Sequence, residues 1–112
     1  MCTKSQLDEI LSTVALESKK VFGDRLYSVI LFGSYARGDY DDDSDIDIMI
    51  LVDLPAESIS EYRTRIDALC GDLLLKYGLV ISAIEKDKET YMRYASTLPF
   101  YQNIEREGIK IA

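Results

Sequence analysis

The chain has 112 residues, 47% of them hydrophobic, which is enough for one domain with one core and ordinary for a globular protein. It contains no histidine, which excludes Ser-His and Cys-His nucleophilic catalysis within the chain. Its formal net charge of −7 argues against direct nucleic-acid binding, because such binding needs lysine and arginine to neutralise phosphates.

A helix over residues 5–21 is the first predicted element. Apolar residues recur within it at the spacing of one helix face, namely Leu7, Ile10, Leu11, Val14 and Val21. We expect this face to pack on a sheet, and a partner-binding helix is the alternative.

A buried strand is predicted over residues 26–32, since six of these seven residues are apolar or aromatic. The strand ends at Gly33-Ser34, and residues 35–37 are expected to open a short helix. Glycine permits close backbone approach, and Ser34 can offer a hydroxyl and an N–H to a phosphate oxygen. The turn is therefore a candidate phosphate site, although an ordinary strand-to-helix turn would look the same when taken alone.

A second buried strand is predicted over residues 44–52. Side chains alternate along a strand, so Asp45 and Asp47 share one face. Because so apolar a strand is expected to be covered on both sides, a charge at Asp47 needs a partner. Divalent metal is a suitable one: hard cations take oxygen ligands, and two metals can clamp the attacking and leaving oxygens of an in-line displacement. Solvated carboxylates at a strand end are the alternative, and residues 39–43 are expected to form a solvated acidic loop.

A long helix is predicted over residues 55–77, opened by Pro55 and ended by Gly78. It separates the strand 44–52 from a later apolar run, residues 79–85, which is predicted to be the third strand. A helical connection of this length joins parallel neighbours by a right-handed crossover, so we expect these two strands to be parallel.

The last third of the chain predicts two short helices and an edge strand. Asp87 is expected to cap the first helix, and Pro99 to open the second, which Gly108 closes before a strand over residues 109–111. Four aromatic residues cluster here: Tyr91, Tyr94, Phe100 and Tyr101. Core packing is the favoured interpretation of this cluster, with adenine stacking or a partner surface as the alternatives.

Residues 33–38 (GSYARG) and 44–48 (SDIDI) together resemble the signature of the polymerase-β-type nucleotidyltransferase superfamily. Within it, the chain is similar to the minimal nucleotidyltransferases. The resemblance implies an α/β (α+β) fold, with a small mixed sheet flanked by helices. It also implies that one nucleotidyltransferase domain spans residues 1–112.

The resemblance assigns roles to six residues of the two motifs. It implies that ATP is the substrate and that two Mg²⁺ ions are bound at the site. The aspartates, Asp45 and Asp47, would be the metal ligands and the catalytic residues. The nucleotide-binding residues would be Gly33 and Ser34 at the β/γ-phosphates, Arg37 at a phosphate, and Ser44.

The chain departs from the family at its third carboxylate, which normally lies in the middle of a later strand and helps to activate the acceptor hydroxyl. The expected position is Ser82, which cannot act as a general base. Glu85 is the nearest carboxylate, but its parity differs from that of Ser82, so it should point to the opposite face. We therefore expect Mg²⁺-nucleotide binding more firmly than turnover.

Two hypotheses follow from these motifs. The first is an enzyme that transfers AMP to a hydroxyl, which could be a tyrosine of a HEPN-type helical partner in a toxin-antitoxin pair. The second is a turnover-deficient nucleotide-binding or antitoxin-type protein that acts by contact. Either would involve a protein partner or a homo-oligomer, and a small-molecule acceptor remains a third option.

The sequence also predicts where the protein resides. No apolar run is long enough to span a bilayer, and the first five residues lack the apolar stretch of a signal peptide. Its two cysteines, Cys2 and Cys70, suit neither a disulfide framework nor a zinc site. We expect a cytoplasmic protein without membrane association.

Overall fold

The structure is a computed structural model that describes residues 2–112, so Met1 of the predicted domain 1–112 lies outside the described residues. Four strands form one sheet in the order β3-β2-β1-β4. Their bounds are β1 Leu26–Phe32, β2 Ile46–Val52, β3 Ile81–Asp87 and β4 Ile109–Lys110. Strand β1 is antiparallel to β2 and β4, whereas β2 and β3 are parallel. The sheet is therefore mixed, as predicted, and the parallel pair flanks the long helical connection.

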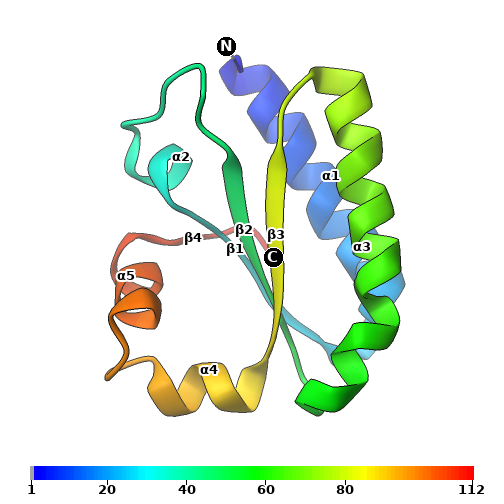
Figure 1. Cartoon of the computed structure of the whole chain (residues 1–112), viewed down its shortest axis with the longest axis vertical. Helices are drawn as coiled ribbons and strands as arrows, with labels where there is room; N and C mark the ends of the chain where they lie inside the picture. Colours follow the sequence, from blue (N-terminus) through cyan, green and yellow to red (C-terminus); the bar gives the residue numbers. More distant parts are fainter. Residues whose placement is uncertain (1) are drawn as a thin grey trace.

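Five α-helices flank this sheet on both sides (Figure 1). Two long helices cover one face, α1 (Lys4–Phe22) and α3 (Ala56–Tyr77). The other side carries two short ones, α4 (Lys88–Tyr94) and α5 (Pro99–Glu107), while α2 (Ser34–Arg37) lies at the end of β1, where its buried Tyr35 joins the core under α1 and α3. A 3₁₀ turn, Gly23–Arg25, links α1 to β1. The mixed α+β fold that the sequence predicts is thus the fold observed.

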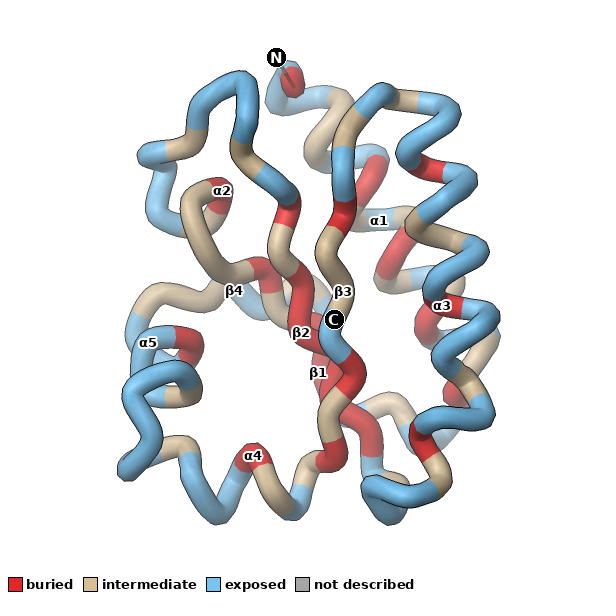
Figure 2. Tube along the Cα trace, viewed as in Figure 1, coloured by how far each residue is buried: buried red, intermediate tan, exposed pale blue. Residues whose placement is uncertain are grey.

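The sheet separates two apolar cores, and β2 belongs to both. Figure 2 shows β2 buried along most of its length. The larger core lies under α1 and α3 and takes Ile46, Ile48, Ile50 and Val52 from β2. The smaller one joins Met49 and Leu51 to Tyr91 of α4 and Ile104 of α5. Asp47 is the one residue of β2 that is not fully buried. The prediction that this strand is covered on both faces is confirmed. The exception is Asp47, whose side chain is only partly buried.

Two strands begin two residues later in the structure than the sequence predicts. Strand β2 starts at Ile46, because the backbone of Ser44 is held in a turn by the Asp41 carbonyl at 3.2 Å. Strand β3 starts at Ile81 and runs to Asp87, because Gly78 ends α3 with φ 70° and the chain needs two further residues to reach the sheet. Asp87 then caps α4 by accepting a hydrogen bond from the Thr90 amide at 2.9 Å, as predicted.

The C-terminal segment is bonded to β1, although about 80 residues separate them in sequence. The Ile111 amide donates to the Val29 carbonyl at 2.8 Å, and the Val29 amide donates to the Ala112 carbonyl at 2.9 Å. Because α5 comes directly before β4, this pairing holds α5 against the sheet.

None of the helices within residues 2–112 combines the length and apolarity that crossing a bilayer requires. Cys2 and Cys70 are both free thiols, so neither belongs to a disulfide in the described chain.

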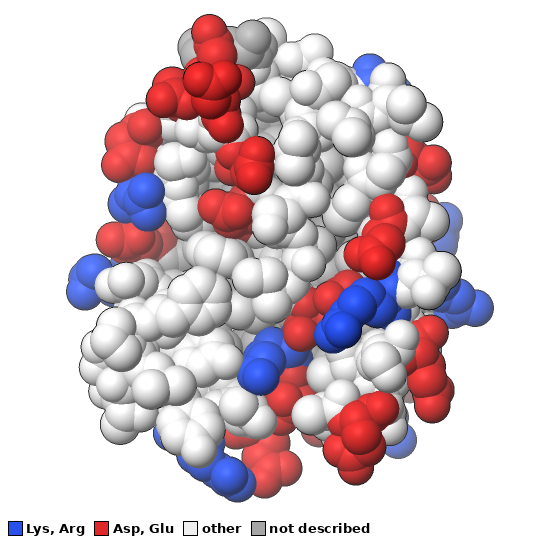
Figure 3. Space-filling view, viewed as in Figure 1, with Lys and Arg blue, Asp and Glu red and all other residues white. Residues whose placement is uncertain are grey.

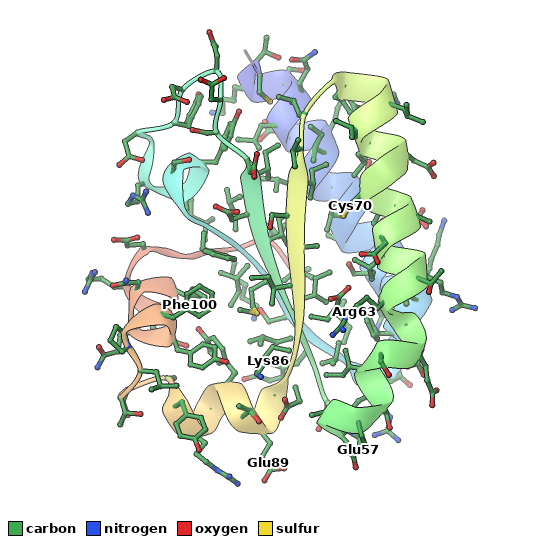
Figure 4. The ribbon with its side chains drawn as sticks, in the orientation of Figure 1. Glu57, Arg63, Cys70, Lys86, Glu89 and Phe100 are labelled. Carbon is green, nitrogen blue, oxygen red and sulfur yellow. The ribbon has the colours of Figure 1, made fainter. Side chains whose placement is uncertain are left out.

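A buried carboxylate, Glu85, lies on the face of β3 that α3 covers. The parallel register pairs Glu85 with Ile50, on the sheet face opposite to that of Asp47, as its parity predicts. Its Oε2 is 3.7 Å from Arg63 Nε, while its Oε1 is buried and accepts no hydrogen bond from the described residues. Figure 4 shows Arg63 reaching from α3 toward β3. Burial raises the pKa of Glu85 in spite of Arg63.

The substitution Glu85→Gln is expected to stabilise the protein at pH 7 by about 1 kcal/mol, raising Tm by about 4 °C, because it removes a poorly compensated buried charge. A carboxyl whose folded-state pKa is raised contributes stability that is present below the ordinary pKa of 4.5 and lost as pH rises through the folded pKa. The gain in the variant should therefore vanish at about pH 4. Thermal melts of the wild type and the variant between pH 4 and 8 measure this difference in Tm.

Glu89→Gln provides the control for this substitution. It removes an exposed carboxylate that pairs with Arg93 at 3.0 Å, and exposed pairs contribute little. A lower Tm for Glu85→Gln at pH 7 would show instead that the pair with Arg63 stabilises the fold.

Candidate functional site

A cavity of about 460 Å³ opens where β1 runs into α2, with α5 as its opposite wall. The residues lining it are Phe32, Gly33, Ser34, Arg37, Asp47, Phe100, Asn103, Ile104, Arg106 and Glu107. Four of the six predicted site residues thus meet at one cavity. A wider hollow of about 780 Å³ between α1 and the end of α3 holds none of them.

Gly33 allows the backbone turn after β1 to lie directly against the carboxylate of Asp47. Its backbone has φ 74° and ψ −156°, a region that only glycine adopts readily. The register pairs Phe32 with Asp47, so the side chain of Asp47 comes beside Gly33. A Cβ at position 33 would clash with Asp47 Oδ2 and lie 3.2 Å from its Cγ. The missing side chain therefore leaves the space that the Asp47 carboxylate occupies.

Asp47 is half-buried and no lysine or arginine within residues 2–112 makes an ion pair with it. Burial raises the pKa of this carboxyl, and the charge of Asp45 raises it further, while the charge of Arg37 lowers it. Asp45 lies two residues before Asp47 in the chain, so both carboxylates stand at the start of β2. A half-buried carboxylate with a second one nearby favours a bound cation.

Arg37 lies at the rim and is already engaged by two acids. Its Nε is 3.1 Å from Asp39 Oδ2, and its Nη1 is 3.3 Å from Glu107 Oε2 on α5. The hydrogen bonds to Asp39 and then Glu107 raise the pKa of its guanidinium. A phosphate approaching Arg37 would compete with these carboxylates for it.

The other two predicted residues do not line the cavity. Ser44 lies in the α2–β2 link, where its hydroxyl is 3.2 Å from Asp41 Oδ1 and accepts from the Asp41 amide at 3.0 Å. Asp45 comes just before β2 and is exposed. Acidic side chains gather over this link (Figure 3), as expected of a solvated acidic loop.

Ser82 is paired with Asp47 in the parallel register of β2 and β3, so the two share one face of the sheet. Within residues 2–112, no group of three or more Asp, Glu, Cys or His side chains is arranged to hold a metal ion. The site therefore offers two neighbouring carboxylates, with a hydroxyl where a third could stand.

Half of the cavity wall, the part from α5, was not predicted. The residues Phe100, Asn103, Ile104 and Glu107 recur at i, i+3, i+4 and i+7, the spacing of one helix face. Of these four, only Phe100 belongs to the aromatic cluster for which the sequence leaves adenine stacking open. The polar members resemble an ordinary solvent face, and only the pairing of β4 with β1 brings them opposite Gly33.

Comparison with known proteins agrees with this arrangement. A family described as the nucleotidyltransferase domain matches residues 11–110. MJ0604 of Methanocaldococcus jannaschii, named as an inferred protein adenylyltransferase, is 43% identical over 94 residues, which are 84% of each chain. The protein adenylyltransferase MntA of Thermococcus cleftensis is 33% identical over 84 residues, covering 70% of this chain and 83% of that protein.

Among solved structures, a toxin-antitoxin with AMP-PNP contains a chain with a similar fold. The TM-score is 0.54 at 23% sequence identity, and the match covers 88% of this chain and 70% of that one. At this level of identity the likeness concerns the fold alone.

Proposed function

Because this chain belongs to the nucleotidyltransferase domain family, within which it is a minimal nucleotidyltransferase, we propose that it is an Mg²⁺-dependent enzyme that transfers AMP from ATP to a hydroxyl group. One observation carries the proposal: Gly33, Ser34 and Asp47 meet at a single cavity of about 460 Å³. The proposal assigns the whole activity to one domain, residues 1–112.

The donor set of the site suits Mg²⁺. Asp45 and Asp47 supply only carboxylate oxygens, which hard cations prefer. The burial that raises the pKa of Asp47, together with the charge of Asp45, disfavours two free carboxylates and would be relieved by a divalent cation. When bound, Mg²⁺ would neutralise the charge that develops on the phosphate oxygens.

The remaining contributions come from the chain itself. Ser34 would bind a terminal phosphate through its hydroxyl and amide, at the turn that Gly33 leaves open. Arg37 would exchange a carboxylate partner for a phosphate. Because α5 forms the opposite wall of the cavity, the nucleotide would be held between α5 and the Gly-Ser turn, so the residues would act mainly by positioning.

The acceptor is proposed to be a protein hydroxyl, such as a tyrosine of a HEPN-type helical partner. Two relatives carry the name of protein adenylyltransferase, and the structure of similar fold is called a toxin-antitoxin. The net charge of −7 disfavours a nucleic-acid acceptor and favours a basic protein. The cytoplasm is the proposed location.

Calorimetric titration of ATP, with and without Mg²⁺, tests the nucleotide part of this proposal. Mass spectrometry of proteins that co-purify with the tagged chain, after incubation with ATP and Mg²⁺, then tests for transfer of one AMP. Mg²⁺-dependent binding followed by a labelled tyrosine is the expected result. A wild-type protein that binds no ATP in the presence of Mg²⁺ would overturn the proposal.

A binding protein without turnover is the second candidate, favoured by Ser82 opposite Asp47. Ser82→Asp would add a third carboxylate beside Asp47, and positioned general bases contribute about 10²–10⁴-fold. If the missing base limits an intact site, we expect this variant to raise pyrophosphate release at least tenfold, with little change in ATP affinity. Ser96→Asp is the control, since Ser96 is an exposed residue of the α4–α5 link that does not line the cavity. No gain over wild type in Ser82→Asp would show that the missing carboxylate is not what limits turnover.

A further inference from the structure

Phe100 is an exposed aromatic ring in the wall of the nucleotide cavity. It is 47% exposed, and in Figure 4 its ring points from α5 toward the sheet. Its ring neighbours are Phe32, at a centroid distance of 5.8 Å and an angle of 89°, and Tyr101, at 5.5 Å and 61°. Both meet it edge-on, so neither of these rings lies flat against it.

A polar side chain accompanies this ring one helical turn further along. Asn103 follows Phe100 by three residues on the cavity face of α5. Its Oδ1 accepts a hydrogen bond from Arg106 Nη2 at 2.7 Å, which orients the amide so that its NH₂ group remains available as a donor. The wall thus combines a flat apolar ring with a hydrogen-bond donor, which together suit a flat heterocycle with acceptor nitrogens.

The two halves of the cavity also differ in chemistry. Gly33, Ser34 and Asp47 form the part suited to phosphate and metal, whereas Phe100 is the aromatic residue of the α5 wall across the cavity from them. A cavity of about 460 Å³ lies in the range typical of small-ligand sites, which is about 300–1,000 Å³. A nucleotide with its phosphates at Gly33 would have its base directed along α5.

We propose that Phe100 and Asn103 form the nucleobase subsite, in which Phe100 stacks on the base and Asn103 donates to a ring nitrogen of a purine. This inference rests on the proposed function, because it assigns the base of the same nucleotide. It gives α5 the role of selecting the nucleotide, while the Gly-Ser turn and the aspartates hold its phosphates.

Titrations of Mg-ATP and of Mg-tripolyphosphate, which has no base, test this subsite. Phe100→Ala should weaken Mg-ATP binding about tenfold or more, the loss of one base–aromatic stack, and should leave tripolyphosphate binding unchanged. Phe100→Tyr keeps the ring and should bind ATP like the wild type. Asn103→Ala should weaken ATP several-fold and leave tripolyphosphate unaffected.

Leu98→Ala is the matched control, since Leu98 is a 43% exposed apolar residue at the start of α5 that does not line the cavity. If Phe100→Ala binds ATP as tightly as the wild type, the base lies elsewhere and the inference is wrong. Equal weakening of both ligands would also overturn it, because Phe100 would then only shape the cavity. If the wild type binds neither ligand, the proposed function itself fails.

Discussion

Replacing Asp47 with asparagine is expected to abolish Mg²⁺-dependent ATP binding and to lower AMP transfer by about a thousandfold or more, since metal neutralisation contributes several kcal/mol. Asp47 is the one aspartate that lines the cavity, and the neutral amide is a poor metal ligand. Titration of ATP with and without Mg²⁺ and an assay of pyrophosphate release measure the two effects. The metal-free variant should also melt a few degrees higher, because the half-buried charge beside Asp45 is gone.

Asp43→Asn is the control for the loss of one negative charge. It removes a carboxylate from the exposed α2–β2 link without touching the cavity, so Mg-ATP binding should persist. Binding of Mg-ATP by Asp47→Asn at wild-type affinity would contradict the assignment of Asp47 to the metal.

The substitution Gly33→Ala is expected to destabilise the protein by about 2 kcal/mol, lowering Tm by about 8 °C, and to weaken Mg-ATP binding about a hundredfold. The backbone at Gly33 has a φ of 74°, and the new methyl group would clash with Asp47 Oδ2. Asp47 would have to leave its position, so stability and binding should both fall. Thermal melts and ATP titrations measure the two losses.

Gly38→Ala separates backbone strain from the clash. Gly38 also has a positive φ, 86°, but its added methyl group would meet nothing within 4 Å. This variant should lose stability and retain nucleotide binding. Equal losses of binding in both variants would mean that the strain in the α2 segment, and not the contact with Asp47, governs the site.

Local sequence patterns predicted most of the fold because they are tied to backbone chemistry. The apolar run of β1 is bounded by glycine, so its bounds were predicted without error. Leu79 and Val80 are equally apolar, yet they only lead into β3, since the end of a strand is decided by where its partner begins. The 3₁₀ turn after α1 has no comparable signal and was not predicted.

Local patterns also predicted part of the candidate site. Gly33, Ser34 and Asp47 lie on adjacent strands or the turn between them, so alternation and register bring them together. The α5 wall depends on a pairing between β1 and β4 that no local pattern encodes. Its one usable signal was the aromatic Phe100 with a polar residue three positions later.

The short β4 strand has a consequence for the motions of the site. Two residue pairs join β4 to β1, and the hydrogen bonds of Ile111 and Ala112 to Val29 extend this pairing. Ile104 is the fully buried residue of α5. Opening of α5 together with β4 would break this short pairing and uncover the smaller core but leave the larger core intact, so it requires less free energy than global unfolding. Amide protons in this wall should exchange with solvent well before those of β2, and a bound nucleotide would slow them by holding the wall shut. Part of the affinity for the nucleotide would then be set by how firmly β4 stays paired, through residues that never touch the ligand.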